Sequence, residues 1–162
     1  MSTDNLDVSN TGQEKGESVF DSRSLEDIYE EIREAYLADE RPWVIGYSGG
    51  KDSTTALQLI WYAIKEIPDE QQTKPIHVIS SDTLVETPKI VNHITSTLEN
   101  INEYAEKEDL PFEAHKVTPK VDDSFWVNLI GRGYPAPNQT FRWCTERLKI
   151  DPADRFIENK VS

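Results

Sequence analysis

The sequence predicts an α/β fold organised around a parallel sheet, because two kinds of segment alternate along the chain. Three short apolar runs are typical of buried strands: residues 43–47, 76–80 and 111–117. Two segments between them carry apolar residues at helical spacing: Leu57, Ile60, Ile64 and Ile67, then Val91, Ile94, Leu98, Ile101 and Ala105. This alternation predicts a parallel sheet with right-handed crossovers. A doubly wound sheet usually has more than three strands, so we expect the domain to be incomplete.

Capping residues and prolines set the expected ends of the helices. Ser24 and Asp27 have the spacing of a capping box, which predicts that a helix begins there. Pro68 is expected to end the helix that follows the first strand, because proline cannot continue a helix. The other expected features are a first helix over 24–38, a cap at Thr87 followed by Pro88, an apolar turn at 125–130 and one or two short helices within 145–160.

Length and charge restrict the class of protein. The 162 residues are about one domain, and the net charge is −13, of which residues 1–42 carry −8 from 12 acidic and 4 basic side chains. A chain without a basic patch or stripe is not expected to bind nucleic acid without a partner. Apolar runs fall short of the ~20 residues of a membrane span, and one cysteine, Cys144, favours a cytoplasmic protein. We expect residues 1–22 to be a disordered acidic leader and residues 23–162 to form the domain.

The strongest chemical signal is the run SGGKDS at residues 48–53, directly after a predicted strand and before a predicted helix. Glycines allow close approach of a ligand, and the free amides and dipole of a helix start favour an anion. Lys51 adds positive charge, and the hydroxyls of Ser48 and Ser53 add donors. It is not a Walker A loop, because Asp52 follows the lysine where that motif has Ser or Thr. We interpret the run as a phosphate cradle; the alternative is an ordinary turn of an α/β protein.

Three segments resemble a known group of enzymes. Residues 47–54 (YSGGKDST) resemble the PP-loop of the adenine nucleotide α-hydrolase superfamily, whose members cut ATP between the α and β phosphates. Residues 82–88 (DTLVETP) and 140–157 (TFRWCTERLKIDPADRFI) resemble the phosphoadenylyl-sulfate reductase group. Within that group they are most similar to DndC-type proteins, which act in DNA phosphorothioation. The resemblance spans about residues 43–157 and implies a Rossmann-like sheet of the adenine nucleotide α-hydrolase type carrying a partial PP-loop nucleotide-binding domain.

The resemblance also implies roles for individual residues. Four loop residues are expected to hold pyrophosphate: Ser48, Gly49, Gly50 and Ser53. Lys51 and Asp52 are the implied catalytic residues, Lys51 stabilising charge on the leaving group and Asp52 binding magnesium or bracing the loop. Residues of the later segments are expected to face the nucleotide: Asp82, Thr83, Arg142, Arg147 and Lys149.

Simpler alternatives remain open for several of these residues. Asp82 either accepts from a ribose or adenine donor, holds a metal, or merely ends a strand with Thr83. Arg147 and Lys149 are alternatively ordinary basic residues of a surface helix; residues 145 and 149 share a helical face, whereas 147 points elsewhere. Cys144 is either a sulfur relay, with a thiol pKa lowered by neighbouring arginines, or a small buried residue.

The cofactors and partners are expected from the same resemblance. ATP and Mg²⁺ are the expected ligands, whereas the iron–sulfur cluster of DndC-type proteins typically needs four cysteines and this chain has one. The three histidines, His77, His93 and His115, show no zinc-ligand spacing, so no metal ligand is assigned. We expect DNA to be reached only through partner subunits or a missing C-terminal part, sulfur to come from a cysteine desulfurase-type donor, and no membrane to be involved.

The expected function is an ATP α–β pyrophosphatase and sulfurtransferase that adenylates DNA backbone phosphate for sulfur incorporation. One alternative is a sulfate-assimilation enzyme, either a phosphoadenylyl-sulfate reductase or an ATP sulfurylase small subunit. The reductase reading is weakened because the sequence lacks the Cys-Gly redox tail of that group. The other alternative is a nucleotide-binding subunit without catalysis. The missing tail, cluster cysteines and later strand together lead us to expect an N-terminal fragment of a longer enzyme.

Overall fold

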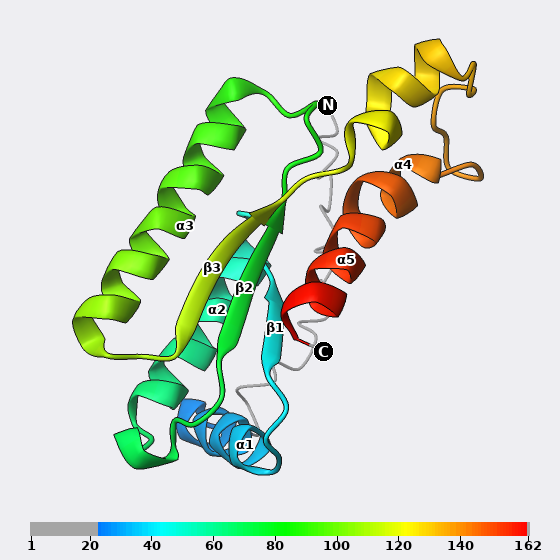
Figure 1. Ribbon diagram of the computed structural model, residues 1–162. Coiled ribbons are helices and arrows are strands. Elements are labelled where there is room, and N and C mark those ends of the chain that lie inside the picture. Colours follow the sequence, from blue (N-terminus) through cyan, green and yellow to red (C-terminus); the bar gives the residue numbers. More distant parts are fainter. Residues whose placement is uncertain (1–22, 162) are drawn as a thin grey trace, which may run out of the picture.

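The computed structural model describes residues 23–161 and shows helices on both sides of a small sheet (Figure 1). The expected leader, residues 1–22, lies outside the described residues. The main elements are α1 (Leu25–Leu37), β1 (Trp43–Gly46), α2 (Lys51–Lys65), β2 (Ile76–Ser81), α3 (Pro88–Glu108), β3 (Phe112–Val117) and α5 (Asp151–Lys160). Short turns complete the chain: η2 (Asp69–Gln71), η3 (Val121–Asp123), η4 (Val127–Gly131), α4 (Trp143–Thr145) and η5 (Glu146–Ile150).

The sheet is parallel, and its strands follow one another in space in the same order as in the sequence, β1-β2-β3. Trp43 lies opposite Ile76 in the first pair, and Ile76 lies opposite Phe112 in the second. The predicted fold class is therefore confirmed: the chain is an α/β protein with an open, parallel, Rossmann-like sheet. All three strands point the same way, so their carboxyl ends meet at one edge.

The hydrophobic core lies between the sheet and the helices that connect its strands. Alternate strand residues face this core, because successive side chains of a strand point to opposite faces. Its strand members are Ile76 and Val78 of β2 and Phe112 and Ala114 of β3. The buried helical members are Leu57 and Ile64 of α2 and Ile94, Leu98, Ile101 and Ala105 of α3. Both crossover helices thus cover the same face, as two successive right-handed crossovers in one direction require.

The opposite face of the sheet is covered by α5, the last helix of the chain (Figure 1). Its Phe156 ring lies 4.7 Å from the ring of His115 and 5.6 Å from the ring of His77, measured between centroids. This face is more polar than the core face, because Glu113 lies beside the two histidines.

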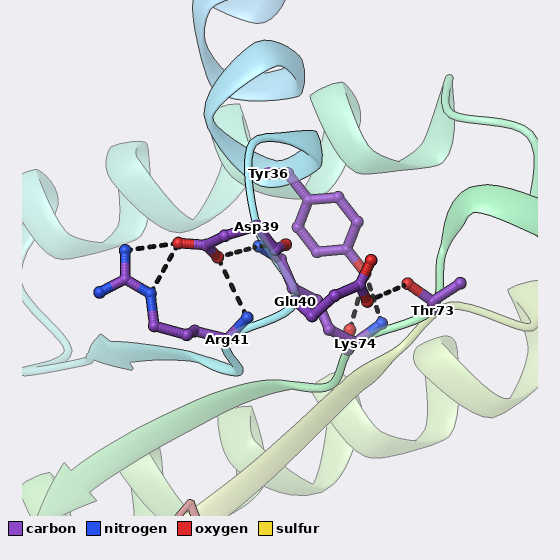
Figure 2. A network of polar contacts seen from close by, with 6 residues as sticks. All are labelled: Tyr36, Asp39, Glu40, Arg41, Thr73 and Lys74. Atoms are coloured by element: carbon purple, nitrogen blue, oxygen red, sulfur yellow. Dashed lines mark hydrogen bonds and ion pairs between the residues drawn. The ribbon is translucent and has the colours of Figure 1, made fainter.

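A buried lysine joins α1 to the start of the sheet (Figure 2). Lys74, 3% exposed, donates from Nζ to the backbone carbonyl of Asp39 at 2.8 Å and to its Oδ1 at 3.1 Å. Its ammonium also lies 4.7 Å from the ring centre of Tyr36, whose hydroxyl donates to the Lys74 carbonyl at 2.7 Å. Hydrogen bonds from Arg41 and then from Lys74 hold the pKa of Asp39 at about 2. The cluster fixes the entry into β1.

Most expected element ends agree with the structure, with two corrections at the ends of helices. Ser24 and Asp27 do form a capping box at the start of α1. Thr87 stands at the N-cap of α3, but its side chain makes no capping hydrogen bond; its backbone carbonyl accepts from the Ile90 and Val91 amides instead. Ile67, expected within the helix, is buried just beyond the end of α2.

The two C-terminal segments fold as π-helical turns joined to short helices. The expected apolar turn is η4, whereas α4, η5 and α5 follow one another without a break from Trp143 to Lys160. Within residues 23–161, no helix is both long and apolar enough to cross a membrane.

Candidate functional site

The SGGKDS run forms a tight turn between β1 and α2. Gly49 has a φ of +75°, and Gly50 is the N-cap residue of α2. The hydroxyls of Ser48 and Ser53 lie 3.1 Å apart, and Ser53 donates to the Gly50 carbonyl at 3.0 Å. Lys51 is exposed at the first position of the helix. Because Gly50 has no side chain to cap α2, the first backbone amides of that helix remain available to an anion.

Packing against α3 explains why a glycine is needed in this turn. A Cβ added to Gly49 would lie 3.3 Å from Cγ1 of Ile94, in addition to the strain of its positive φ. Ile94 is itself part of the core. The loop is therefore fixed against a buried side chain.

A cavity of about 590 Å³ opens beside this turn, at the carboxyl ends of β1 and β2. Its walls come from the two strand ends, the start of α3 and the last helical segment: Gly46, Tyr47, Ser48, Ser80, Glu86 and Lys149. Ser80 is 1% exposed, and its hydroxyl has no hydrogen-bond partner among the described residues. An unpaired buried hydroxyl is energetically costly, which sets Ser80 apart from the other residues of the cavity wall.

A second cavity, of about 570 Å³, adjoins the first. Glu86 and Lys149 line both cavities, so an acidic and a basic side chain lie where the two cavities meet. The second cavity contains four residues singled out in the sequence: Thr83, Arg142, Cys144 and Lys149. Ser48 of the predicted PP-loop, the segment after β2 and the Arg142–Lys149 segment therefore contribute to two adjoining cavities, whereas the rest of the SGGKDS run lines neither.

The carboxylate of Asp82 is engaged within its own turn. Oδ1 accepts from the amide of Leu84 at 3.0 Å, and Oδ2 lies 3.6 Å from the ammonium of Lys116. Thr83 is buried and donates to a carboxylate oxygen of Glu86 at 3.0 Å. Asp82 thus holds the turn after β2, whereas Thr83 orients Glu86 at the cavities.

Arg147 lies away from both cavities. Its guanidinium donates to Asp123 at 3.0 Å and to the hydroxyl of Tyr134 at 3.1 Å. Thr145 and Lys149 both line the second cavity, which confirms the expectation that they share a face from which residue 147 points away. The hydrogen bonds of Arg147 therefore join it to η3 and to the loop after η4.

Two residues of this site were missed by the sequence analysis. Glu86 follows Thr83 by three residues, but its place between the cavities depends on the turn at Leu84, whose φ is +62°. Ser80 is a buried polar residue near the carboxyl end of β2, and a polar residue at that end of a parallel strand is the signal that would have found it.

Two of the three histidines lie together in the structure, although their spacing along the sequence led us to assign no metal ligand. His77 and His115 lie together with Glu113 on the sheet face that α5 covers. Their convergence follows from the register, which pairs His77 with Glu113 and places His115 two residues further along β3. Nothing in the spacing along the chain indicates this register.

Comparisons with known proteins give one weak similarity and no family. No family model matches the chain. It is 28% identical over 127 residues to an uncharacterized protein of Methanocaldococcus jannaschii, MJ0066, a match that covers 78% of this chain. The match spans 22% of that relative's length.

Proposed function

We propose that this chain binds ATP at the SGGKDS turn and acts as a PP-loop ATP pyrophosphatase of the DndC-like type, activating a DNA backbone phosphate for sulfur incorporation. The observation that carries the proposal is the turn itself: a strand is followed by Ser48, which lines a cavity of about 590 Å³, and then by a glycine at positive φ and a glycine-capped helix start. Helix starts of this kind bind phosphate groups. The unpaired hydroxyl of Ser80 supports a polar occupant of the same cavity.

In the proposed reaction, a non-bridging oxygen of the DNA phosphate attacks the α-phosphorus of ATP. The bond between that phosphorus and the bridging oxygen breaks, and pyrophosphate leaves with the negative charge. The amides at the start of α2 and the Lys51 ammonium stabilise this charge. Lys149, between the two cavities, supplies a further cation toward the α-phosphate.

Sulfur would then replace AMP on the activated phosphate. A cysteine desulfurase-type partner delivers it as a persulfide on Cys144, in the second cavity. The terminal sulfur of the persulfide forms a bond to phosphorus while AMP leaves. A thiol of the partner then attacks Sγ of Cys144 and breaks the S–S bond. This step leaves the sulfur on phosphorus and joins Cys144 to the partner in a mixed disulfide. Arg142 lines the same cavity and would supply positive charge beside the activated phosphate.

The expected inorganic cofactors differ in how well the residues present suit them. The exposed carboxylate of Asp52, in the first turn of α2, is a ligand of the type Mg²⁺ prefers and would hold the ion beside the phosphates. Bound there, the ion would neutralise charge on the triphosphate. An iron–sulfur cluster does not fit, because Cys144 is the single cysteine of the sequence.

The charge of the chain supports a proposal in which another protein makes the DNA contacts. A net charge of −13 repels a polyanion, so a basic partner would supply most phosphate contacts. We propose the cytoplasm as the compartment, where a single thiol such as Cys144 stays reduced.

A thermal melt with and without Mg-ATP tests nucleotide binding first. At about 100 times Kd, a ligand that binds only the folded state adds roughly 2.7 kcal/mol of stability, or about 5–10 °C for a chain of this size. We expect this shift in the wild type and a smaller one in Lys51→Ala. Lys107→Ala is the matched control, because Lys107 is exposed near the far end of α3 and pairs with Glu103. Equal shifts in wild type and Lys51→Ala would refute the assigned role of the loop.

Pyrophosphate release then separates the functions. Release that depends on DNA and on Lys51 supports the proposed activity. ATP–pyrophosphate exchange that depends on sulfate instead would assign the chain to sulfate assimilation. Binding of ATP without any turnover, in the presence of DNA and of sulfate, would make it a non-catalytic nucleotide-binding subunit.

A further inference from the structure

Three metal-binding side chains converge on the sheet face opposite the core. Nδ1 of His77 lies 3.4 Å from Nε2 of His115 and 3.6 Å from Oε2 of Glu113, and the last two atoms are 3.4 Å apart. The register explains the arrangement: His77 is opposite Glu113, and His115 follows on the same face of β3.

These three distances suit a shared metal ion better than hydrogen bonds. They exceed the roughly 2.7–3.2 Å typical of hydrogen bonds between such atoms. They match the edge of a tetrahedron around Zn²⁺, which is about 3.3–3.6 Å for bonds of about 2.0–2.2 Å. One ion at equal distance from all three atoms would therefore need little movement of the ligands.

The surroundings of the three side chains differ on their two sides. The Phe156 ring against both histidines limits water on one side, whereas Glu113 is 55% exposed and leaves a path to solvent.

We propose that His77, Glu113 and His115 bind one divalent transition-metal ion of the Zn²⁺ class. The ion joins β2 to β3 beneath α5, and three protein ligands leave a fourth position open to water, as in catalytic rather than closed structural zinc sites. The site shares no residue with the proposed nucleotide cavity, although Ile79, two residues after His77 on β2, lines that cavity. It does not depend on the proposed function.

Metal titration of the full chain, with any histidine tag removed, tests this site. Zn²⁺ is titrated in competition with a chromophoric chelator, and Co²⁺ absorption reports the coordination geometry. We expect one equivalent to bind, with the intense visible absorption of tetrahedral Co²⁺, and Kd to rise about tenfold or more in His115→Gln and in Glu113→Gln. His93→Gln is the control, because His93 is exposed on α3, which covers the other face of the sheet.

A melt with Zn²⁺ provides a second readout that does not depend on competition. Zn²⁺ is expected to raise the midpoint of the wild type and of His93→Gln, but not of His115→Gln. His115 is 26% exposed, so its replacement leaves the core intact, and circular dichroism of each variant checks the fold. The proposal is overturned if no saturable single-site binding occurs, or if His115→Gln and Glu113→Gln bind Zn²⁺ as the wild type does.

Discussion

Replacing Lys74 by methionine tests whether the buried ammonium holds α1 and β1 in place. Methionine keeps a long apolar side chain over the rings of Tyr36 and Trp43, whose centres lie 4.7 and 5.3 Å from the ammonium. It removes the two hydrogen bonds to Asp39, at 2.8 and 3.1 Å. The carboxylate of Asp39 keeps Arg41 as a partner, so the change leaves no isolated buried charge.

The expected loss follows from these contacts. A hydrogen bond to a charged group contributes about 1.5–3 kcal/mol, and a partly desolvated cation over an aromatic ring about 1–2 kcal/mol. Avoiding the burial of an ammonium recovers part of this sum. We therefore expect Lys74→Met to lower the free energy of unfolding by about 2–3 kcal/mol, and the melting midpoint by roughly 5–10 °C.

Urea unfolding and thermal melts measure this loss, with Lys107→Met as the control. Lys107 is exposed and pairs with Glu103 one turn away, so its replacement is expected to change little. Acid titration adds a second readout. The stability from ionised Asp39 is complete above its ordinary pKa of 3.8 and is lost as the pH falls through about 2. Without Lys74 the pKa of folded Asp39 lies closer to 3.8, so this loss is smaller and is complete at a higher pH. An unfolding midpoint equal to that of Lys107→Met would refute the reasoning.

Two further predictions concern the loop and the sheet face. Gly49→Ala is expected to lower the free energy of unfolding by about 1–2 kcal/mol, because alanine is strained at a φ of +75° and its Cβ would press on Ile94. The same substitution is expected to weaken ATP binding. Thermal melts that match those of the wild type would contradict this prediction. Burial lowers the pKa of His77 in the folded chain below its ordinary value of 6.5. As the pH falls below 6.5, this histidine is therefore protonated in the unfolded chain before it is protonated in the folded chain. The metal-free protein is expected to lose stability over that range. Urea unfolding at about pH 7.5 and about pH 5.5 measures the loss, and His77→Gln should reduce it; an undiminished loss in that variant would assign it elsewhere.

The fold was predictable where local patterns dominate. Ser24 with Asp27, and the apolar repeat from Val91 to Ala105, specify helices through spacing alone, and both helices formed as expected. The π-helical turns η4 and η5 were not predictable as such, because five-residue hydrogen bonding leaves no distinct apolar period in segments so short.

The candidate site likewise has a part that the local sequence predicts and a part that depends on residues far away in the sequence. The SGGKDS turn is local, and its position after β1 follows from the sequence. The directions of Asp82 and Arg147 depend on Lys116 and Asp123, partners 34 and 24 residues away. The meeting of His77 with His115 depends on the register of β2 and β3, which is set by the whole core rather than by either segment.

The order of the strands also bears on how the chain acquires its structure. Each strand pairs with the one that precedes it in the sequence, and each connecting helix covers the pair it joins. Among the three described strands, a ribosome therefore releases each later strand after the neighbour on which it docks. Loop closure between consecutive strands spans one helix only, which keeps the entropy lost at each step small. The sheet is thus suited to assembly during synthesis, with α5 arriving last to cover the histidine-bearing face.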